Sequence, residues 1–351
     1  MIKLLIVDDS ALMRRQLVSL FEAEGDFEIR LARNGKEAVQ ENIAFSPDVI
    51  TLDINMPEMD GLTALSLLME QRPVAVVMVS SLTEKSALAT FEALALGAVD
   101  YVTKPGGTIS LSIDAIRQDL IGKVRAAARA KLKTIRGSLP RARPEPIAPL
   151  RAPVLVRRGI AGVGLVIIGV STGGPCTLES ILPLLPATFP WPVLVAQHMP
   201  GSFTLPFANR MNDLCQLQVI EVSRQMALEP GTVYIAKGGA DIVVAQRGGK
   251  LVTLARPESA EFLWHPSVEL LGRSVAEHLD VSRVIAVMLT GMGSDGANAF
   301  TEIKRQGGRT IAESEESSVV FGMPAELIKR GGATVVLDAN KIANQIITWA
   351  R

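Results

Sequence analysis

The chain has 351 residues, of which 48% are hydrophobic and 21% are charged, and its formal net charge is zero. This length exceeds what one ordinary hydrophobic core supports, so we expect two domains. The sequence has no apolar run long enough to cross a membrane. Its two cysteines, Cys176 and Cys215, indicate a reduced, cytoplasmic protein without structural disulfides.

The charges are distributed unevenly along the chain. Residues 1–105 carry 16 acidic and 9 basic side chains, residues 106–160 carry 3 and 12, and residues 161–351 carry 17 and 15. An acidic segment and a mildly acidic segment therefore flank a basic connector. This pattern argues against nucleic-acid binding by either flanking segment.

Strand and helix patterns alternate through residues 1–105, which predicts a parallel sheet covered by helices. The first seven residues lead directly into Asp8 and Asp9, so we interpret them as a strand rather than as a signal peptide. We expect strands at 3–7, 28–32, 49–52, 74–79 and 101–102, and helices at 11–24, 35–42, 61–71 and 83–96.

Polar side chains stand at the ends of four of these strands: Asp8 and Asp9, Asp53, Ser80 and Lys104. In a parallel sheet the carboxyl ends of the strands meet at one edge. A single aspartate there commonly caps the next helix, but five polar residues at successive strand ends indicate a shared site. Three converging carboxylates require a cation, and hard oxygen ligands suit Mg²⁺. The lysine and the hydroxyl could then bind an incoming phosphoryl group.

The connector has two parts. Residues 112–133 have a helical pattern with one apolar face, which we expect to close the first domain. Residues 136–159 have no apolar periodicity and contain five prolines and six arginines. This composition predicts a semi-extended tether, or alternatively a docking segment for an acidic partner or for the acidic first domain.

Residues 161–351 have a second set of α/β patterns, which predicts a doubly wound, mainly parallel sheet. We expect strands at 165–170, 193–197, 218–222, 284–289 and 334–337, and helices at 176–185, 202–213, 267–278, 295–306 and 339–349. Three shorter runs, at 233–236, 242–246 and 251–254, predict an antiparallel flap that includes a hairpin at Gly248-Gly249.

The turn after the strand at 165–170 is the strongest candidate for catalysis. Ser171 sits between Gly169 and the sequence Gly173-Gly174-Pro175, at a tight strand-to-helix turn. A serine there is exposed at the carboxyl edge of the sheet, and the backbone N–H groups of the following helix start can hold an anion. The pattern therefore predicts a nucleophile beside an oxyanion site.

A serine nucleophile needs a base, and the base needs an orienting carboxylate. His198 ends the strand at 193–197, and Asp295 lies in the glycine-rich loop after the strand at 284–289, so both belong to the same edge as Ser171. Each residue alone has a structural explanation, since serine and aspartate commonly cap helices. Their common position at strand ends favours the catalytic interpretation. Met292, in the same loop, could line the pocket or present its backbone N–H.

Two other interpretations of the Ser171 turn fit the sequence less well. The residues 169–173 match the G-x-S-x-G turn of α/β-hydrolases, whose triad runs in the order serine, acid, histidine. That order would require Asp213 or Asp241 with His265 or His278, and none of these has a convincing position at a strand end. A dinucleotide-binding loop would need G-x-G-x-x-G spacing, which the turn lacks.

Four motifs of the first segment are similar to those of the receiver domain of bacterial response regulators: VDDS, LDINMPEMDG, VSS and TKP. This resemblance implies a flavodoxin-like fold with a parallel five-stranded sheet. It implies Asp53 as the phospho-acceptor, Mg²⁺ bound by Asp8, Asp9 and Asp53, and Ser80 and Lys104 as the switch hydroxyl and the phosphate-pairing lysine.

Four motifs of the second segment resemble the chemotaxis protein-glutamate methylesterases, the CheB family: IGVSTGGP, AQHMP, LTGMGSDGA and SSVVFGMP. The resemblance covers nearly the whole chain and implies a receiver at 1–120, a helical and then Pro/Arg-rich linker at 121–160, and a catalytic domain at 161–351. It implies Ser171 as nucleophile, His198 as base and Asp295 as orienter, with an oxyanion pocket at Thr172, Gly173 and Met292.

The same resemblance implies a cytoplasmic, phosphorylation-activated hydrolase that removes glutamyl methyl esters from chemoreceptors and deamidates their glutamines, giving sensory adaptation. Its partners would be methyl-accepting chemoreceptors as substrate and a CheA-type histidine kinase as phosphodonor, without nucleic acid or membrane insertion. The catalytic domain would need no cofactor. A phosphorylation-gated binding module with a catalytically silent second domain is the alternative class.

The chain departs from the family pattern at several positions. Asn55 stands where relatives often carry an acidic residue, which bears on the lifetime of the phosphoryl group. Residues 236–241 replace a common Ala-Pro-Gly and histidine pattern, Cys176 replaces a small residue or carboxylate, and Glu313 replaces a glutamine. These positions bear on substrate contacts.

Overall fold

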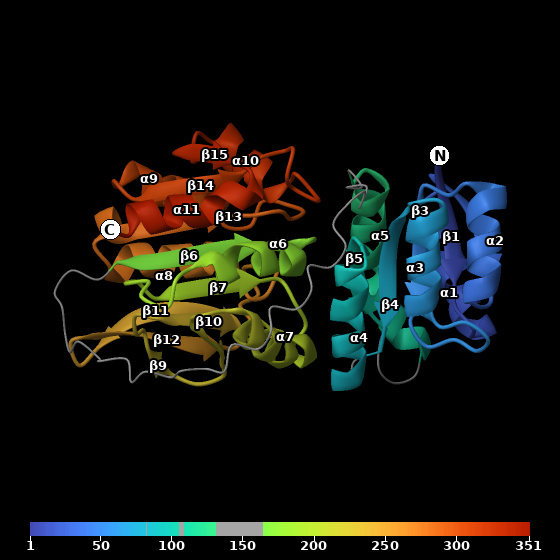
Figure 1. Ribbon diagram of the computed structural model, residues 1–351, viewed down its shortest axis with the longest axis horizontal. Coiled ribbons are helices and arrows are strands. Elements are labelled where there is room, and N and C mark those ends of the chain that lie inside the picture. The colour runs from blue at the N-terminus through green and yellow to red at the C-terminus, as the bar shows by residue number, and fades with distance from the viewer. Residues whose placement is uncertain (82, 105–108, 131–163) are drawn as a thin grey trace.

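The structure is a computed structural model that describes residues 1–81, 83–104, 109–130 and 164–351 (Figure 1). The described chain forms two α/β units that lie side by side. The whole Pro/Arg-rich connector predicted at 136–159 lies outside the described residues, so the tether or docking role assigned to it stays a prediction. No helix in the described ranges combines the length and apolar character needed to cross a membrane.

The first unit is a parallel sheet with the strand order β2-β1-β3-β4-β5. Strands β3 and β4 are buried along their whole length, because helices cover both faces of the sheet. The predicted five-stranded receiver fold is confirmed. The strands are β1 (Ile2–Val7), β2 (Phe27–Ala32), β3 (Val49–Asp53), β4 (Ala75–Ser80) and β5 (Asp100–Thr103), and the helices are α1 (Ala11–Glu22), α2 (Gly35–Phe45), α3 (Gly61–Gln71), α4 (Glu84–Ala95) and α5 (Ile109–Ala128).

Helices α1, α2 and α3 begin where the sequence supplies a capping side chain. Ser10, Asn34 and Asp60 accept hydrogen bonds from backbone N–H groups three residues ahead, which satisfies donors that the first helical turn leaves unpaired. These caps start each helix directly after a loop at the carboxyl edge of the sheet. The three caps thereby fix the loops at the edge that carries the acidic residues.

The second unit contains a parallel sheet with the strand order β15-β14-β13-β6-β7-β10-β8 and a small antiparallel sheet with the order β11-β12-β9. The parallel strands are β6 (Leu165–Val170), β7 (Val193–Gln197), β8 (Gln218–Val222), β10 (Thr232–Ala236), β13 (Val284–Met288), β14 (Arg309–Glu313) and β15 (Val335–Leu337). The antiparallel strands are β9 (Met226–Ala227), β11 (Asp241–Arg247) and β12 (Lys250–Arg256). The helices are α6 (Gly174–Ile181), α7 (Gly201–Leu214), α8 (Val268–His278), α9 (Ala297–Arg305), α10 (Met323–Lys329) and α11 (Ala339–Trp349), with short 3-10 turns at Leu182–Leu184 and Val281–Arg283.

One part of the predicted flap is wrong. The hairpin at Gly248-Gly249 forms as β11 and β12, but the run predicted at 233–236 is β10, which lies in the parallel sheet between β7 and β8. All five residues of β10 are buried, and a short apolar run does not reveal which sheet will bury it. The sequence prediction also missed β14 and α10, which are only five and seven residues long.

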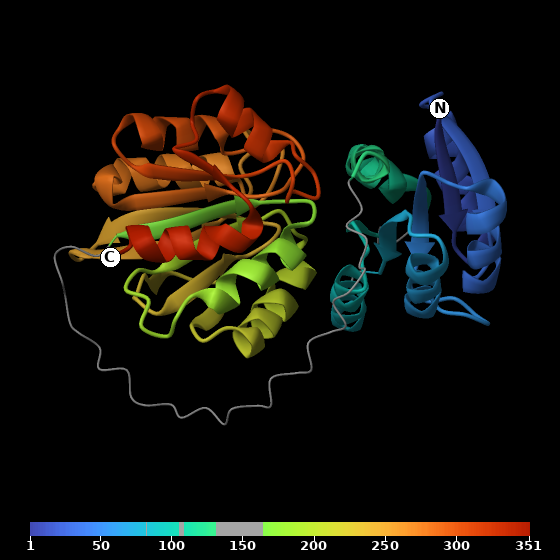
Figure 2. The same cartoon turned by 45° about the horizontal axis from the view of Figure 1, so that its top comes forward.

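The two units meet through aromatic side chains. The ring of Tyr101 on β5 stacks on the ring of Phe203 on α7, with centroids 4.7 Å apart. Phe91 on α4 packs against Phe203 at 6.0 Å and against Phe207 at 5.5 Å. In Figures 1 and 2, α4 and β5 are the parts of the first unit that face α6 and α7. The face of the first unit formed by α4 and β5 is therefore docked on the second unit.

We predict that Phe91→Ala weakens this docking, because burial of a phenylalanine side chain contributes about 1.5–3 kcal/mol. Amide hydrogen exchange in α6 and α7 should become faster in the unphosphorylated chain. Leu88→Ala is the matched control, since Leu88 lies on the same helix and is 59% exposed. Equal exchange in wild type and Phe91→Ala would show that this ring does not hold the units together.

Candidate active site

Three neighbouring strands bring the predicted catalytic residues to one edge of the large sheet. Strand β6 lies between β13 and β7, so the residues that follow these strands are adjacent. Ser171 follows β6 and its N–H donates to the carbonyl of Thr290 after β13 at 3.0 Å. His198 follows β7 and its N–H donates to the carbonyl of Val170 at 3.0 Å. Asp295 lies in the loop between β13 and α9.

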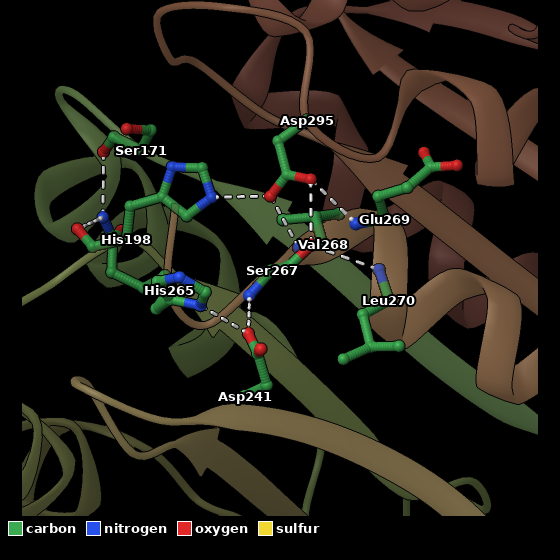
Figure 3. Close-up of polar contacts among 10 residues, drawn as sticks. Ser171, His198, Asp241, His265, Ser267, Val268, Glu269, Leu270 and Asp295 are labelled. Atoms are coloured by element: carbon green, nitrogen blue, oxygen red, sulfur yellow. Dashed lines mark hydrogen bonds and ion pairs between the residues drawn. The ribbon is translucent and has the colours of Figure 1, made fainter. Parts of the chain in front are cut away.

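His198 and Asp295 are in direct contact, as Figure 3 shows. Nε2 of His198 lies 2.9 Å from Oδ2 of Asp295, and both side chains are buried. The carboxylate also accepts the backbone N–H groups of Val268 at 2.6 Å and Glu269 at 3.0 Å, and the hydroxyl of Ser267 at 3.2 Å. The first two donors belong to the first turn of α8, where unpaired N–H groups favour negative charge.

The environment of Asp295 keeps this carboxyl ionised. Burial alone would raise its pKa, but the hydrogen bond and charge of His198 and the two α8 N–H donors outweigh burial and lower the pKa below its usual value. An ionised carboxylate only accepts hydrogen bonds, so Nε2 of His198 is the donor in this pair. Nδ1 of His198 is buried and has no hydrogen-bond partner among the described residues. It is the ring nitrogen left to take a proton.

Ser171 lies at the same edge, but no hydrogen bond within the described residues joins its hydroxyl to His198. Its carbonyl accepts the side-chain N–H of Gln197 at 3.0 Å, and the same amide group donates to the carbonyl of His198 at 3.1 Å. Gly291 allows the loop after β13 to pass close by, because a Cβ at this position would lie 2.7 Å from the Cβ of Ser171.

The predicted oxyanion residues surround the Ser171 turn. Gly173 precedes α6 with φ of +78°, a left-handed conformation that suits glycine. Thr172 is buried, and its carbonyl accepts the hydroxyl of Thr290 at 2.9 Å. The turn leads directly into α6, and the first turn of this helix carries partial positive charge. This placement suits an oxyanion site.

The first unit covers part of this site. The hydroxyl of Thr172 donates to Oδ2 of Asp100 on β5 at 2.6 Å, across the boundary between the units. A Cβ on Gly122 of α5 would lie 2.8 Å from Cε of Met292, so the backbone of α5 packs directly against the Met292 side chain. Two of the predicted pocket residues are thus in contact with the docked first unit.

Sequence reasoning missed a second histidine–carboxylate pair. Nδ1 of His265 lies 2.9 Å from Oδ1 of Asp241, and the ring of the neighbouring Trp264 stacks on the ring of His198 with centroids 6.0 Å apart. Asp241 and His265 had been weighed as members of an alternative triad. They do pair, but no contact in the described chain joins them to Ser171, whose neighbouring strands supply His198 and Asp295 instead. His265 comes from a loop after a strand of the other sheet, so strand-end reasoning could not place it.

The first unit has its own polar site at the carboxyl edge. Carboxylate oxygens of Asp8, Asp9 and Asp53 lie within 4.8 Å of one another, as predicted from their strand ends. Nζ of Lys104 lies 2.8 Å from Oδ2 of Asp8 and 2.8 Å from Oδ2 of Asp53. The hydroxyl of Ser80 is buried. The oxygen donor set is of the kind that Mg²⁺ prefers, so the residues fit the cation predicted there.

Burial and charge act in opposite directions on the pKa values of this cluster. Burial raises the pKa of Asp53, and the neighbouring Lys104 ammonium only partly offsets the increase. Burial would lower the pKa of Lys104, but its contacts with Asp53 and Asp8 raise it above the usual value. The lysine therefore stays charged, and it compensates two buried carboxylates.

These observations define a two-domain protein, in which a receiver-type acidic site is joined to an α/β domain that carries serine, histidine and aspartate at one sheet edge. The family described as CheB methylesterase matches residues 166–346, and the response regulator receiver domain matches residues 4–114. The chain belongs to the CheB methylesterase family, as its motifs predicted.

Three similar proteins illustrate the match. A protein of Rhodospirillum rubrum, named protein-glutamate methylesterase/protein-glutamine glutaminase 3, is 56% identical over 361 residues, covering 99% of this chain and 96% of that protein. A protein of Rhodopseudomonas palustris, which bears the same name with the number 2, is 50% identical over 359 residues and covers 99% and 98%. The crystal structure of the Thermotoga maritima CheB methylesterase catalytic domain is 40% identical, covers 53% of this chain and 98% of that chain, and has a TM-score of 0.51.

We predict that the ionised state of Asp295 stabilises the fold above about pH 4. Its pKa is lower in the folded chain than in the unfolded chain, where it is about 3.9, so its contribution is complete above that value and is lost as pH falls through the folded pKa. The difference in unfolding free energy between wild type and Asp295→Asn should therefore shrink as the pH is lowered below 4. Asp213→Asn, at an exposed aspartate of α7, is the control. A difference that is constant with pH would contradict the assignment.

Proposed function

We propose that this chain is a phosphorylation-activated protein-glutamate methylesterase that also deamidates glutamine, and that its substrates are methyl-accepting chemoreceptors. The observation that carries the proposal is the buried His198–Asp295 pair, which lies at the same sheet edge as the Ser171 turn and beneath a docked receiver. The names of the related proteins support the same substrate chemistry. The corresponding cellular role is adaptation in a chemotaxis-type pathway. For this role the protein would act in the cytoplasm.

The reaction follows from the orientation of His198. Because Nε2–H donates to Asp295, the free lone pair is on Nδ1, and Nδ1 takes the proton of the Ser171 hydroxyl. The serine oxygen attacks the γ-carbonyl carbon of a glutamyl methyl ester. The N–H groups of the Ser171 turn bind the oxyanion that forms, which is usually a large term in such reactions. His198 returns the proton to the leaving methoxide, and methanol departs.

The second half of the reaction repeats these steps with water. Nδ1 of His198 removes a proton from water, the hydroxide attacks the acyl-serine carbonyl, and the proton returns to the oxygen of Ser171. The product is a glutamate side chain. Glutamine deamidation has the same balance, with ammonia as the leaving group in place of methanol. Asp295 stays ionised and stabilises the imidazolium that forms in each half.

The first domain controls access to this site. Asp53 is the proposed phospho-acceptor and a CheA-type histidine kinase is the proposed donor. A bound Mg²⁺, held by Asp8, Asp9 and Asp53, would supply charge neutralisation to the phosphoryl group. In the docked arrangement Asp100 accepts a hydrogen bond from the hydroxyl of Thr172, and α5 packs on Met292. The unphosphorylated chain is therefore the closed form, and phosphorylation shifts the population toward an open form.

The contacts of Ser80 suggest how the phosphoryl group reaches the docking face. The Thr90 hydroxyl on α4 donates to the carbonyl of Ser86 at 2.7 Å, and its oxygen lies 3.1 Å from Oγ of Ser80, within hydrogen-bond distance. The next residue of α4, Phe91, packs on Phe203 and Phe207 of the second domain. When the Ser80 hydroxyl turns toward the phosphoryl group, its contact with the Thr90 hydroxyl is lost. Helix α4 then loses one of the contacts that hold it in place. A tenfold activation requires only about 1.4 kcal/mol of differential stability between closed and open forms.

The central test measures methanol release from a methylated receptor fragment, with and without a small phosphodonor and Mg²⁺. We predict release that rises with the phosphodonor in wild type, lacks this rise in Asp53→Ala, and is abolished in Ser171→Ala. Asp295→Asn should lower kcat by roughly 10⁴-fold, as loss of an orienting carboxylate does in serine proteases. Absence of release under all conditions, with Asp53 phosphorylated, would favour the gated binding module.

A second prediction concerns Thr90. Thr90→Val removes a hydrogen bond that holds Ser80 in the closed form, and a hydrogen bond contributes about 1 kcal/mol. Methanol release without phosphodonor should rise roughly fivefold, while release with saturating phosphodonor stays at the wild-type level. Thr90→Ser keeps the hydroxyl and should behave like wild type. Equal basal rates in all three proteins would show that this contact does not restrain the switch.

A further inference from the structure

The Asp241–His265 pair forms the base of a single loop, residues 257–267, which connects β12 to α8 and is called here the β12–α8 loop. Asp241 is the first residue of β11 and its side chain is fully buried. Oδ1 accepts Nδ1–H of His265 at 2.9 Å and the backbone N–H of Ser267 at 2.9 Å, and Oδ2 accepts the backbone N–H of Ser259 at 2.8 Å. One carboxylate thus ties together the two ends of the loop and the histidine inside it.

This loop contacts both members of the proposed catalytic pair. The ring of Trp264 is nearly parallel to the ring of His198, with an interplanar angle of 8° and centroids 6.0 Å apart. At the end of the loop, the hydroxyl of Ser267 donates to Oδ1 of Asp295 at 3.2 Å. Figure 3 shows Ser267 between the two carboxylates, with its N–H directed to Asp241. The described contacts include none between Asp241 and either member of the pair.

Such support matters because His198 is held by one side-chain hydrogen bond. The contact between Nε2 and Asp295 fixes one point of the imidazole ring, and rotation about this point would move Nδ1 away from the Ser171 hydroxyl. A stacked indole restricts that rotation. Since catalytic geometry tolerates little displacement, groups that fix a catalytic side chain from a distance contribute to rate.

We propose that Asp241 is a positioning residue for the reaction. Through its three hydrogen bonds it holds the β12–α8 loop in the conformation that places Trp264 on His198 and Ser267 on Asp295. His265 serves as a donor to Asp241 and takes no proton from substrate. The inference rests on the proposed esterase function, and it assigns a role to a position where the sequence departs from its family pattern.

The test measures kcat and KM for methanol release with saturating phosphodonor and Mg²⁺, so that closure by the receiver does not contribute. Rates are divided by the number of serines that a fluorophosphonate probe labels at completion, which removes the effect of unfolded protein. Asp241→Asn should lower kcat about 10- to 100-fold and leave KM within about twofold. Wild-type kcat in Asp241→Asn, with Ser171→Ala inactive, would overturn the inference. An active Ser171→Ala would instead overturn the proposed function.

Two further sets of variants separate positioning from other roles. If Asp241 acts through Trp264 and Ser267, adding Asp241→Asn to the double variant Trp264→Ala/Ser267→Ala should cause no further loss of activity. His265→Asn keeps a donor for Asp241 and should retain most activity, whereas His265→Leu should resemble Asp241→Asn. Equal, severe losses in His265→Asn and His265→Leu would mean that His265 itself exchanges protons, and a further loss on adding Asp241→Asn to the double variant would mean that Asp241 acts independently of Trp264 and Ser267. Either result would overturn the inference, and the His265 variants decide it even if Asp241→Asn does not fold.

Discussion

The order of the strands β13, β6 and β7 is the constraint on which the site depends. Parallel neighbours end at the same edge, so the residues that follow these strands meet without any sequence proximity. Ser171 and His198 are 27 positions apart and Asp295 is further away still, yet each residue follows the end of one of these strands. The start of α8 then supplies the N–H donors that keep Asp295 ionised.

The same edge is also where the receiver docks. The receiver contributes an aromatic contact, through Phe91 and Tyr101, and a polar contact, through Asp100. Burial raises the pKa of Asp100, and the ammonium group of Lys123 at 3.8 Å partly offsets this effect. A buried carboxylate is costly unless it is compensated, so the hydrogen bond from Thr172 is part of what makes the docked form stable. Release of the receiver would return Asp100 to water and free the hydroxyl of Thr172, the residue next to the proposed nucleophile Ser171, to contact substrate.

Much of this arrangement can be predicted from local patterns. Continuous apolar runs identify buried parallel strands, and polar residues at their ends identify both sites, which is why Asp53, Lys104, Ser171 and His198 are recognisable before the fold is known. The contact between Thr172 and Asp100 is not predictable in this way, because the residues are 72 positions apart and belong to different domains.

The sequence prediction misplaced β10 and missed the Asp241–His265 pair because both depend on long-range contacts. The apolar run of β10 fits either sheet, and its place between β7 and β8 depends on long-range pairing that its own residues do not encode. The Asp241–His265 pair is set by a loop that folds back onto β11, and loop conformation leaves no periodic signal. Capping and turn residues predict where helices begin, but they do not predict which distant loop will pack against them.

We propose that the docked receiver covers the catalytic edge until Asp53 is phosphorylated. The reactivity of Cys176 measures whether the receiver is docked, because Cys176 lies in α6 and its Sγ is 3.4 Å from the carbonyl oxygen of Leu94 on α4. Burial raises the pKa of this thiol to about 12, so it should react slowly with an alkylating reagent in the closed form. The measurement is the rate of Cys176 alkylation in a Cys215→Ser background. We expect the alkylation rate to rise about tenfold with phosphodonor and Mg²⁺, as a shift of about 1.4 kcal/mol in the stability of the closed form relative to the open form would give. We expect no rise in Asp53→Ala. A rate that phosphorylation leaves unchanged would contradict it.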